Sequence, residues 1–297
     1  MAKVLVNEEN LTNIANAIRE KSGETTTYKP GDMATAIQTI SSGGATPEKG
    51  IVINEWDSNG YATDITVVGM GEIPNYYLEL YDYNARHILS KATTIRLPNQ
   101  LTSIGNSAFR NRHELTSLDI PDSVTSIGNN AFYECRYLVI TKLPSALVSI
   151  GSSSFYNCFN IALTELPSGL TSIGDNAFSG CKLKITKIPD NVTTIGLRAF
   201  DSCKYIKTLE LPKSLVSIGS NCFTRCSELA TVILPNVEVV PELGSHAFGS
   251  QYFETPIYNG TGYIYVPDDL VDSFKSATNW STYADQIKPI SELEVSA

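Results

Sequence analysis

The sequence predicts a mostly β solenoid in which about seven short repeats stack between two capping segments. Three recurring features support this fold class: a Leu/Ile-Pro pair, an Ile-Gly pair that follows it in register, and a Phe that follows the glycine. Spacings of 22 or 23 residues separate the prolines, which are Pro98, Pro121, Pro144, Pro167, Pro189, Pro212 and Pro235. A fixed period of this length is typical of units that bury their apolar faces only against their neighbours.

The chain divides into five segments by composition and pattern. Residues 1–40 predict a short strand at Val4–Val6 and a small helical domain, because apolar residues recur at helical spacing. Those apolar positions are Leu11, Ile14, Ile18, Met33 and Ile37. Residues 41–50, SSGGATPEKG, have the composition of a flexible linker. Residues 51–93 predict a β cap that opens with a hairpin, residues 94–250 form the solenoid, and residues 251–297 form a C-terminal cap.

Within each repeat, the stretch before the proline predicts a strand, and the Ile-Gly pair predicts a second short extended segment. The glycine is expected to allow a turn or a close backbone approach. The Ala-Phe-x-x-Cys stretch predicts a helical turn whose side chains join a continuous core. The seven strands before the prolines would then form one sheet about 30 Å long.

The repeat LPSGLTSIGDNAFSGC, from Leu166 to Cys181, resembles the BspA-like, or Treponema-type, leucine-rich repeat. The resemblance covers about half of the chain and implies a leucine-rich-repeat solenoid of the mixed α/β class, used for adhesion and binding and without an active site. The residues that carry it are scaffold positions, such as Leu170, Ile173, Ala177 and Phe178. They do not identify a ligand.

The first segment, NEENLTNIANAIREKSGETTTYKPGDMATAIQTI, resembles the start of tailed-phage structural proteins, especially tail and baseplate proteins. This resemblance implies a virion protein that docks to other virion proteins through residues 1–40. The solenoid would present a surface to a host protein or glycan. A bacterial cell-surface adhesin of the BspA type is the first alternative, and a head or tail decoration protein without a receptor role is the second.

Two surface columns allow alternative interpretations. Two residues before each proline, charges alternate in sign as Arg96, Asp119, Lys142, Glu165, Lys187 and Glu210, and Ile233 ends the column. We expect a ladder that stabilises strand register, since opposite charges on adjacent strands attract; a charged binding stripe is the alternative.

Four residues before the proline, three repeats carry an apolar residue, namely Ile140, Leu163 and Ile185. Either a bulge turns these side chains into the core, or they form an exposed strip beside Tyr133, Tyr137, Tyr156, Phe159 and Tyr205. In the second case the strip and the aromatic residues would form a partner-binding surface.

The C-terminal segment YIYVPDDLVDSFKSATNWSTYADQIKPISE resembles the cap that often follows such repeats in Firmicutes surface proteins and in phage proteins. Pro267 and the two aspartates after it predict the start of a helix that runs through Phe274. Trp280 is expected to seal the last repeat.

Composition excludes several functional classes. Thirty-one acidic and twenty-two basic residues give a net charge of −9, which opposes binding to nucleic acid. No apolar run is long enough to span a bilayer, and the start MAKVLVNEENL does not have the pattern of a secretory signal. We therefore expect a protein made in a bacterial host cytoplasm. The resemblances above imply that it resides in the virion, or on the bacterial surface in the alternative. Assembly of several copies into a homo-oligomer is left open.

The positions of the histidines and cysteines predict no catalytic site, no metal site and no cofactor. His87, His113 and His246 are scattered and match no catalytic or metal-binding motif. Five cysteines occupy one repeat position, three residues after the Phe, and Cys222 lies outside this column. We expect a column of reduced, buried thiols rather than disulfides.

Overall fold

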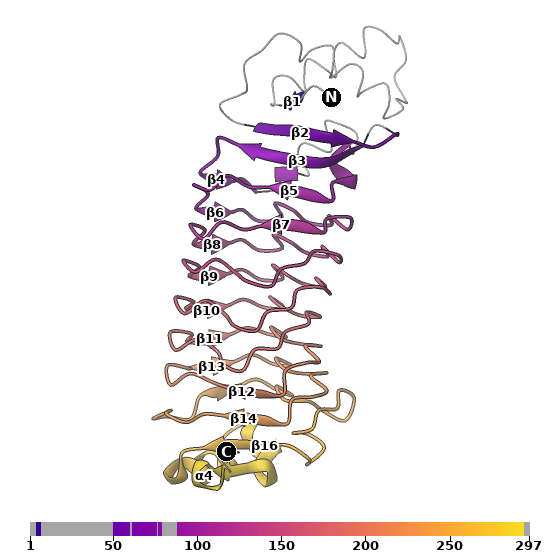
Figure 1. Ribbon diagram of the computed structural model, residues 1–297. Coiled ribbons are helices and arrows are strands. Elements are labelled where there is room, and N and C mark those ends of the chain that lie inside the picture. The colour runs from indigo at the N-terminus through magenta and orange to yellow at the C-terminus, as the bar shows by residue number, and fades with distance from the viewer. Residues whose placement is uncertain (1–3, 7–49, 60, 76, 79–87, 294–297) are drawn as a thin grey trace.

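The computed structural model describes residues 4–6, 50–59, 61–75, 77–78 and 88–293. In these residues the chain winds into stacked coils that form an elongated solenoid, with the N-terminal coils at one end and the C-terminal cap at the other (Figure 1). The predicted fold class is therefore confirmed. The predicted helical domain, linker and docking residues in 7–49 lie outside the described residues.

An antiparallel pair begins the stack. Strands β2 (Gly50–Trp56) and β3 (Ala62–Val68) pair antiparallel, as the hairpin prediction expects, and β1 (Val4–Val6) pairs antiparallel with β2. Strand β3 then pairs in parallel with β5 (Thr94–Arg96), which pairs with β7 (Ser117–Asp119). The hairpin therefore joins the first two solenoid strands in one five-stranded sheet. The short 3₁₀ helix η2 (Ile88–Lys91) precedes β5.

The Ile-Gly pairs form the second side of each coil and give an uninterrupted parallel sheet of eight two-residue strands. In chain order these are β4 (Glu72–Ile73), β6 (Ser103–Ile104), β8 (Ser126–Ile127), β9 (Ser149–Ile150), β10 (Ser172–Ile173), β11 (Thr194–Ile195), β13 (Ser217–Ile218) and β15 (Glu242–Leu243). Each isoleucine pairs with the isoleucine of the next coil, except that Ile218 pairs with Leu243 at the end of the sheet. The 23-residue period therefore fixes the register of this sheet.

The sheet formed by the strands before the prolines is not continuous, which corrects the prediction of one seven-stranded sheet. It resumes only at β12 (Thr208–Glu210), β14 (Thr231–Ile233), β16 (Tyr263–Val266) and β17 (Ile287–Pro289). Between β7 and β12, only isolated bridges such as Ser117 to Val139 and Lys187 to Glu210 occur. Figure 1 shows these middle coils as plain loops beside the labelled short strands.

Side-chain spacing explains this interruption. In the coil of β7 the inward residues Leu118 and Ile120 are two apart, as a strand requires. In the next coil the inward residues Ile140 and Leu143 are three apart, with Thr141 and Lys142 both exposed. The backbone must bulge to turn both apolar side chains inward, so no regular strand forms.

The core consists of aligned columns of identical side chains. Seven phenylalanine rings stack along the axis with centroid separations of 5.2 to 5.7 Å. They are Phe109, Phe132, Phe155, Phe178, Phe200, Phe223 and Phe248, and all are fully buried. Each coil therefore covers the aromatic ring of the coil before it.

The glycine of the Ile-Gly pair permits a close backbone approach between coils, as predicted. A Cβ on Gly151 would lie 2.6 Å from the backbone nitrogen of Asn129 in the preceding coil. The same collision occurs at Gly128, Gly174 and Gly196. Any side chain at these positions would push neighbouring coils apart.

The segment around the Phe contains no helix, which corrects the predicted helical turn. Asn130 and Glu134, on either side of Phe132, have φ values of 55° and 58°. Left-handed residues at these two positions interrupt a right-handed helix. The third side of each coil is instead a pair of hydrogen-bonded turns, such as Tyr133 N to Asn130 O and Cys135 N to Phe132 O.

The thiol column is buried and reduced, as predicted. All six cysteines are free and buried. Each thiol of the column donates a hydrogen bond to a phenylalanine carbonyl in the preceding coil, for example Cys135 Sγ to Phe109 O at 3.0 Å and Cys181 Sγ to Phe155 O at 3.2 Å. Burial raises the pKa of the Cys135 thiol to about 12. These thiols have a structural role.

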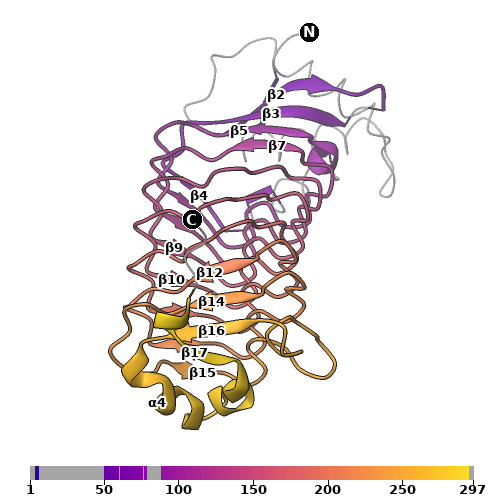
Figure 2. The ribbon, with the colours of Figure 1, turned by 60° about the horizontal axis from the view of Figure 1, so that its bottom comes forward.

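The C-terminal cap closes the last coil with short helices (Figure 2). They are η3 (Asp268–Leu270), α4 (Val271–Ser276), η4 (Trp280–Gln286) and η5 (Ile290–Glu292). Trp280 is fully buried, as the prediction of a sealing residue expects, and its indole Nε1 donates to Pro241 O at 2.7 Å. Tyr283 packs edge-on against Phe248 and contacts the backbone there through its hydroxyl.

Candidate functional site

A row of side chains on the outer surface begins directly after the core phenylalanines. The guanidinium of Arg110 lies 5.0 Å from the ring centroid of Tyr133. The rings of Tyr133 and Tyr156 stack with centroids 5.0 Å apart and planes 11° apart. Because Tyr133 covers one face of the Tyr156 ring, the opposite face is directed toward the next coil.

The next coil has no side chain to continue this stack. It carries Ser179 and Gly180 at the positions that Tyr156 and Asn157 occupy one coil earlier. Gly180 has a φ of +83°, and a Cβ on it would lie 2.9 Å from Asn157 Oδ1. The missing bulk leaves a hollow of about 520 Å³ next to Tyr156. This volume falls within the range of roughly 300–1,000 Å³ that is typical of small-ligand sites.

Aromatic and cationic side chains line this hollow together. Besides Tyr156, it contains Phe159 and Tyr205, each 42% exposed despite their large apolar rings. The cations are Lys182, Lys204 and Arg225. We call this set the aromatic hollow. Aromatic faces exposed beside cations are typical of binding surfaces rather than of a solvated solenoid face.

One ion pair holds the arginine of the hollow in place. The carboxylate of Asp201 is buried, and it accepts hydrogen bonds from Arg225 Nε at 2.9 Å and from Thr224 Oγ1 at 2.9 Å. The guanidinium also forms a second contact with the other carboxylate oxygen and lies 5.1 Å from the ring centroid of Phe253. The hydrogen bond to Asp201 raises the pKa of Arg225.

The charge of the aromatic hollow is positive, although the chain as a whole carries −9. Lys182 Nζ donates to Asn160 Oδ1 at 3.2 Å. In the part of the chain that the structure describes, neither Lys182 nor Lys204 forms an ion pair with a carboxylate. No acidic residue lines the hollow. An anionic ligand would therefore meet two lysines that no carboxylate neutralises, whereas Arg225 is already paired with Asp201.

The structure separates the predicted partner-binding residues into two groups. Tyr156, Phe159 and Tyr205 meet in the hollow, and Tyr133 supports Tyr156 from behind. Tyr137 is 57% exposed but does not line the hollow. Their role in binding stays a prediction.

The exposed apolar strip is not formed, which corrects that interpretation. Ile140, Leu163 and Ile185 are 5%, 0% and 1% exposed. The bulge described above turns them into the core, as the alternative interpretation expected. They are therefore not available to a partner.

The charge ladder is formed at one step only. Lys187 Nζ lies 3.1 Å from Glu210 Oε1, across the bridge between their coils. Arg96 pairs instead with Asp64 of β3, and Lys142 lies 3.9 Å from Asp122. Strand pairing alone does not form the ladder, because Arg96 and Asp119 are register partners on β5 and β7 while Arg96 pairs with Asp64.

The sequence reasoning missed the residues that create the hollow, which are Ser179, Gly180, Lys182, Lys204 and Arg225. Comparing the residue after each core phenylalanine would have found part of the signal. That column has Arg, Tyr and Tyr, and then a Ser-Gly gap. The predicted docking residues Leu11, Ile14, Ile18, Met33 and Ile37 lie outside the described residues.

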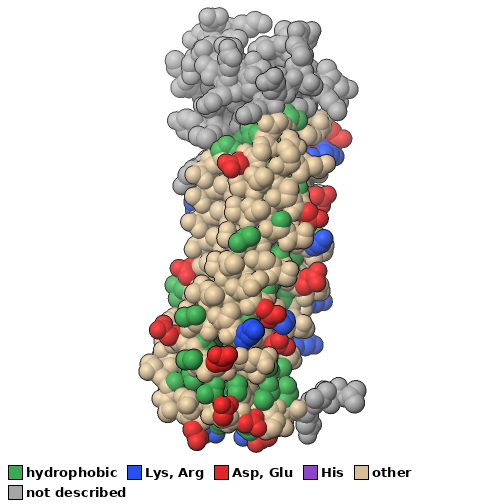
Figure 3. All heavy atoms as spheres, turned by 90° about the vertical axis from the view of Figure 1, so that its left-hand side faces the viewer, with side chains coloured by type: hydrophobic (Ala, Val, Ile, Leu, Met, Phe, Trp, Pro, Cys, Tyr) green, Lys and Arg blue, Asp and Glu red, His purple; other side chains and the backbone are tan. Residues whose placement is uncertain are grey.

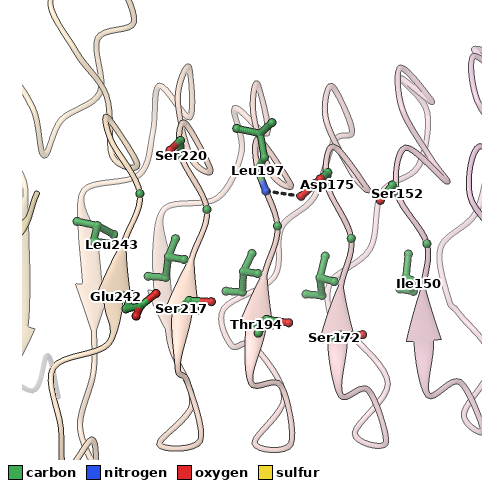
Figure 4. A pocket seen from close by; sticks show the side chains of 18 of the residues that line it. Ile150, Ser152, Ser172, Asp175, Thr194, Leu197, Ser217, Ser220, Glu242 and Leu243 are labelled. Atoms are coloured by element: carbon green, nitrogen blue, oxygen red, sulfur yellow. Dashed lines mark hydrogen bonds between the residues drawn. The ribbon is translucent and has the colours of Figure 1, made fainter.

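A second hollow of about 640 Å³ runs along the eight-stranded sheet (Figure 4). Its lining alternates Ile-Gly pairs with Ser and Thr, and the charged side chains in it are Asp175 and Glu242. Asp175 Oδ1 accepts the backbone N–H of Leu197 at 2.7 Å. This side of the molecule, seen in Figure 3, carries mainly uncharged polar groups with scattered charges. The groove follows from the close approach of coils at the glycines.

In the described residues, no group of histidine, cysteine and acidic side chains is placed to hold a metal ion. His113 Nδ1 lies 2.9 Å from Glu134 O, and His246 occupies a left-handed turn position. None of the described helices has the length and apolar composition needed to cross a membrane.

Comparisons with known proteins agree with the repeat geometry. The profile of the family described as "BspA type Leucine rich repeat region" matches in six copies, over residues 84–206 and 148–261. Curated protein sequences give no match. A solved leucine-rich repeat protein from Bacteroides ovatus ATCC 8483 is 24% identical, with a TM-score of 0.52; the match covers 69% of this chain and 55% of that one. This chain thus spans about half the length of that protein.

A second solved structure, the leucine-rich repeat protein of T. pallidum, is 20% identical over 74% of this chain and 97% of its own, with a TM-score of 0.47.

Proposed function

Because the chain belongs to the BspA-type leucine-rich-repeat family, we propose that it is an attachment protein whose solenoid binds its target through the aromatic hollow. The observation that carries this proposal is the meeting of Tyr156, Phe159 and Tyr205 with two lysines that no carboxylate neutralises, in one hollow. A stacked solenoid suits this task, since each coil is fixed by its neighbours and the binding side chains are therefore held in place before the target arrives.

Weak binding at one hollow is sufficient for attachment when many copies act together. Several copies on one surface raise the overall affinity without any new contact. We therefore expect modest affinity of the single chain and strong attachment of an array.

The cell surface of a bacterium is the first setting that we propose, because the resemblance of the repeat implies adhesion and binding. A virion is the second setting. It is favoured by one specific observation, the resemblance of residues 7–40 to the start of tail and baseplate proteins. In that setting residues 1–40 dock to other virion proteins, and the solenoid contacts the host. If the hollow has no target, the chain is a head or tail decoration protein without a receptor role.

Attachment is tested with fluorescent beads that carry many copies of the full-length protein. The beads are incubated with bacteria from the source culture, and bound beads are counted by flow cytometry. We expect the Tyr156→Ala/Tyr205→Ala variant to lose at least 90% of bead binding. Tyr263→Ala is the matched control, since Tyr263 is also 40% exposed and has Lys288 Nζ 5.9 Å from its ring, but lies outside the hollow. Equal binding by all three proteins would refute the proposal.

The setting is tested by immunogold electron microscopy of the source culture, with an antibody raised against residues 94–250. Gold on bacterial envelopes supports the surface adhesin. Gold on phage particles supports the virion protein, and its position on the tail or the head separates attachment from decoration. A chain lacking residues 1–43 that still joined particles would exclude the docking role of that segment.

A further inference from the structure

The aromatic hollow has the dimensions of one ring in a stack. The coil of Tyr156 and the coil of Asp201 are two steps apart, and the core rings at these steps are separated by 5.5 and 5.7 Å. Ser179 and Gly180 fill little of that space. A six-membered ring placed against Tyr156 would meet its free face at about 4 Å, the ordinary contact distance. The structure thus provides a stacking face whose partner ring is absent from the chain.

The far side of this ring-sized gap carries a fixed cation. Arg225 spends part of its five N–H groups on Asp201 and lies over Phe253, so its guanidinium is held at the rim of the hollow. Lys204 adds a second positive charge. A guanidinium recognises a carboxylate through paired N–H donors. The Nε and Nη2 pair of Arg225 is bound to Asp201, which leaves the Nη1 side of the guanidinium for a ligand. A ligand ring that stacks on Tyr156 would therefore place an attached carboxylate near Arg225 or Lys204.

Four backbone N–H groups around the hollow already have hydrogen-bond partners. The N–H groups of Asn157, Ser179, Gly180 and Ser202 all donate to carbonyl oxygens within the solenoid. An extended peptide normally binds through main-chain hydrogen bonds to a sheet edge or loop. Such bonds from these N–H groups are not available here. The side chains that the hollow offers for recognition are the aromatic faces, the Asn157 amide, the Ser202 hydroxyl and the cations.

We infer that the hollow binds one acidic sugar residue of a surface glycan, with the sugar ring on Tyr156 and its carboxylate at the Arg225–Lys204 side. This inference rests on the proposed function and names the ligand class of the same site. The apolar C–H face of a pyranose ring matches a tyrosine face, and its hydroxyl groups match the amide and hydroxyl side chains. A uronic acid and a sialic acid both supply the required ring and carboxylate.

The test uses the full-length protein and two pairs of probes. One pair is 3′-sialyllactose and its methyl ester, and the other is a glucuronic-acid disaccharide and its methyl ester. Binding is measured by saturation-transfer NMR and isothermal titration calorimetry. We expect at least one acid to bind at least tenfold more tightly than its neutral ester, and the acid that binds identifies the source class.

Ser179→Tyr is designed to extend the Tyr133–Tyr156 stack into the gap. Ser179 is 5% exposed, so the unfolding temperature of this variant is measured beside its binding. We expect it to abolish binding of the acid with an unfolding temperature within a few degrees of the wild type. Lys204→Glu is a second variant on an exposed side chain, and we expect it to lower the affinity for the acidic saccharide at least fivefold. Tyr263→Ala serves again as the control and should bind as the wild type does.

Three outcomes would overturn the inference. Equal affinity for acid and ester would show that the cations do not contribute to binding. Unchanged binding by Ser179→Tyr would show that the sugar binds elsewhere. If no saccharide binds but a glutamate-rich or sulfotyrosine peptide does, the ligand is a peptide. In that last case the bead assay would still show the loss in Tyr156→Ala/Tyr205→Ala, so the attachment function would stand without this ligand.

Discussion

The ring of Trp280 lies against the last ring of the phenylalanine ladder, with its centroid 5.9 Å from that of Phe248 and a tilt of 43° between the planes. The indole thus replaces the coil that would otherwise follow. Phe274 meets Trp280 edge-on from the other side at 4.8 Å. The terminal coil of a solenoid has no neighbour on one side. Trp280 and Phe274 therefore exclude water from its core.

Removing this indole should destabilise the C-terminal end of the solenoid. We expect Trp280→Ala to lower the free energy of unfolding by about 3–5 kcal/mol, the usual cost of truncating a buried aromatic residue. Urea unfolding measures the change. Hydrogen exchange should show amides near Phe248 losing protection before those near Phe132. Trp280→Phe keeps most of the apolar ring and should lose less, so an equal loss in both variants would contradict this account.

The glycine column offers a test with a matched control. Gly151→Ala places a methyl group 2.6 Å from the Asn129 backbone nitrogen, and we expect a loss of about 1–3 kcal/mol, as for an overpacked core. Gly169→Ala meets the nearest atom, Leu147 O, at 3.5 Å, which is ordinary contact. The unfolding temperature of Gly169→Ala should stay close to that of the wild type. If both variants unfold alike, close backbone approach does not explain the column.

Stability should fall at alkaline pH because of the buried thiols. Burial raises the pKa of Cys135 from 9.0 to about 12, and it also raises the pKa of Cys158. Between pH 9.0 and about pH 12, the Cys135 thiol of the unfolded chain releases a proton that the folded chain retains. Unfolding therefore becomes more favourable as pH rises. We expect the urea midpoint to fall between pH 9 and pH 11. Cys135→Val should reduce this slope, and a pH-independent midpoint would contradict the assignment.

The same thiols should not react with thiol reagents in the folded protein. The thiolate is the reactive form, and burial disfavours it. With a chromogenic disulfide reagent at pH 8, we expect all six cysteines to react only after unfolding in denaturant. Rapid reaction of native protein would show that the column opens locally.

Removing either partner of the Asp201–Arg225 ion pair should lower the free energy of unfolding by different amounts. Asp201 is 3% exposed and Arg225 is 50% exposed at the side chain. Arg225→Ala leaves a buried carboxylate without its cation and should cost about 3–5 kcal/mol at pH 7. Asp201→Ala leaves a cation that water can reach and should cost less, about 1–3 kcal/mol.

A double variant tests whether the unpaired carboxylate causes this loss. In Arg225→Ala the buried Asp201 carboxylate keeps its charge without its cation, so adding Asp201→Asn should recover part of the lost stability, measured as the urea midpoint at pH 7. A double variant that is less stable than Arg225→Ala would show that Asp201 is not the responsible group.

The sequence alone determined the stack, because each structural column has one residue type that the period repeats. The phenylalanines, the glycines of the Ile-Gly pairs and the cysteines lie where their spacing predicts. The sealing role of Trp280 also followed from the sequence, since an apolar ring after the last repeat has one uncovered coil to contact. These features depend on neighbours one period apart, and that distance can be counted along the chain.

Tertiary structure decided what breaks the period. Whether Ile140 points inward or outward depends on how the backbone accommodates a three-residue spacing, and packing resolves it inward. The hollow depends on four coils at once: the stacked ring of Tyr156, the small Ser179 and Gly180 of the next coil, and then the coil of Asp201 and the coil of Arg225, which Asp201 holds. No single repeat contains that site, because it is the space left where one coil lacks the side chains that its neighbours carry.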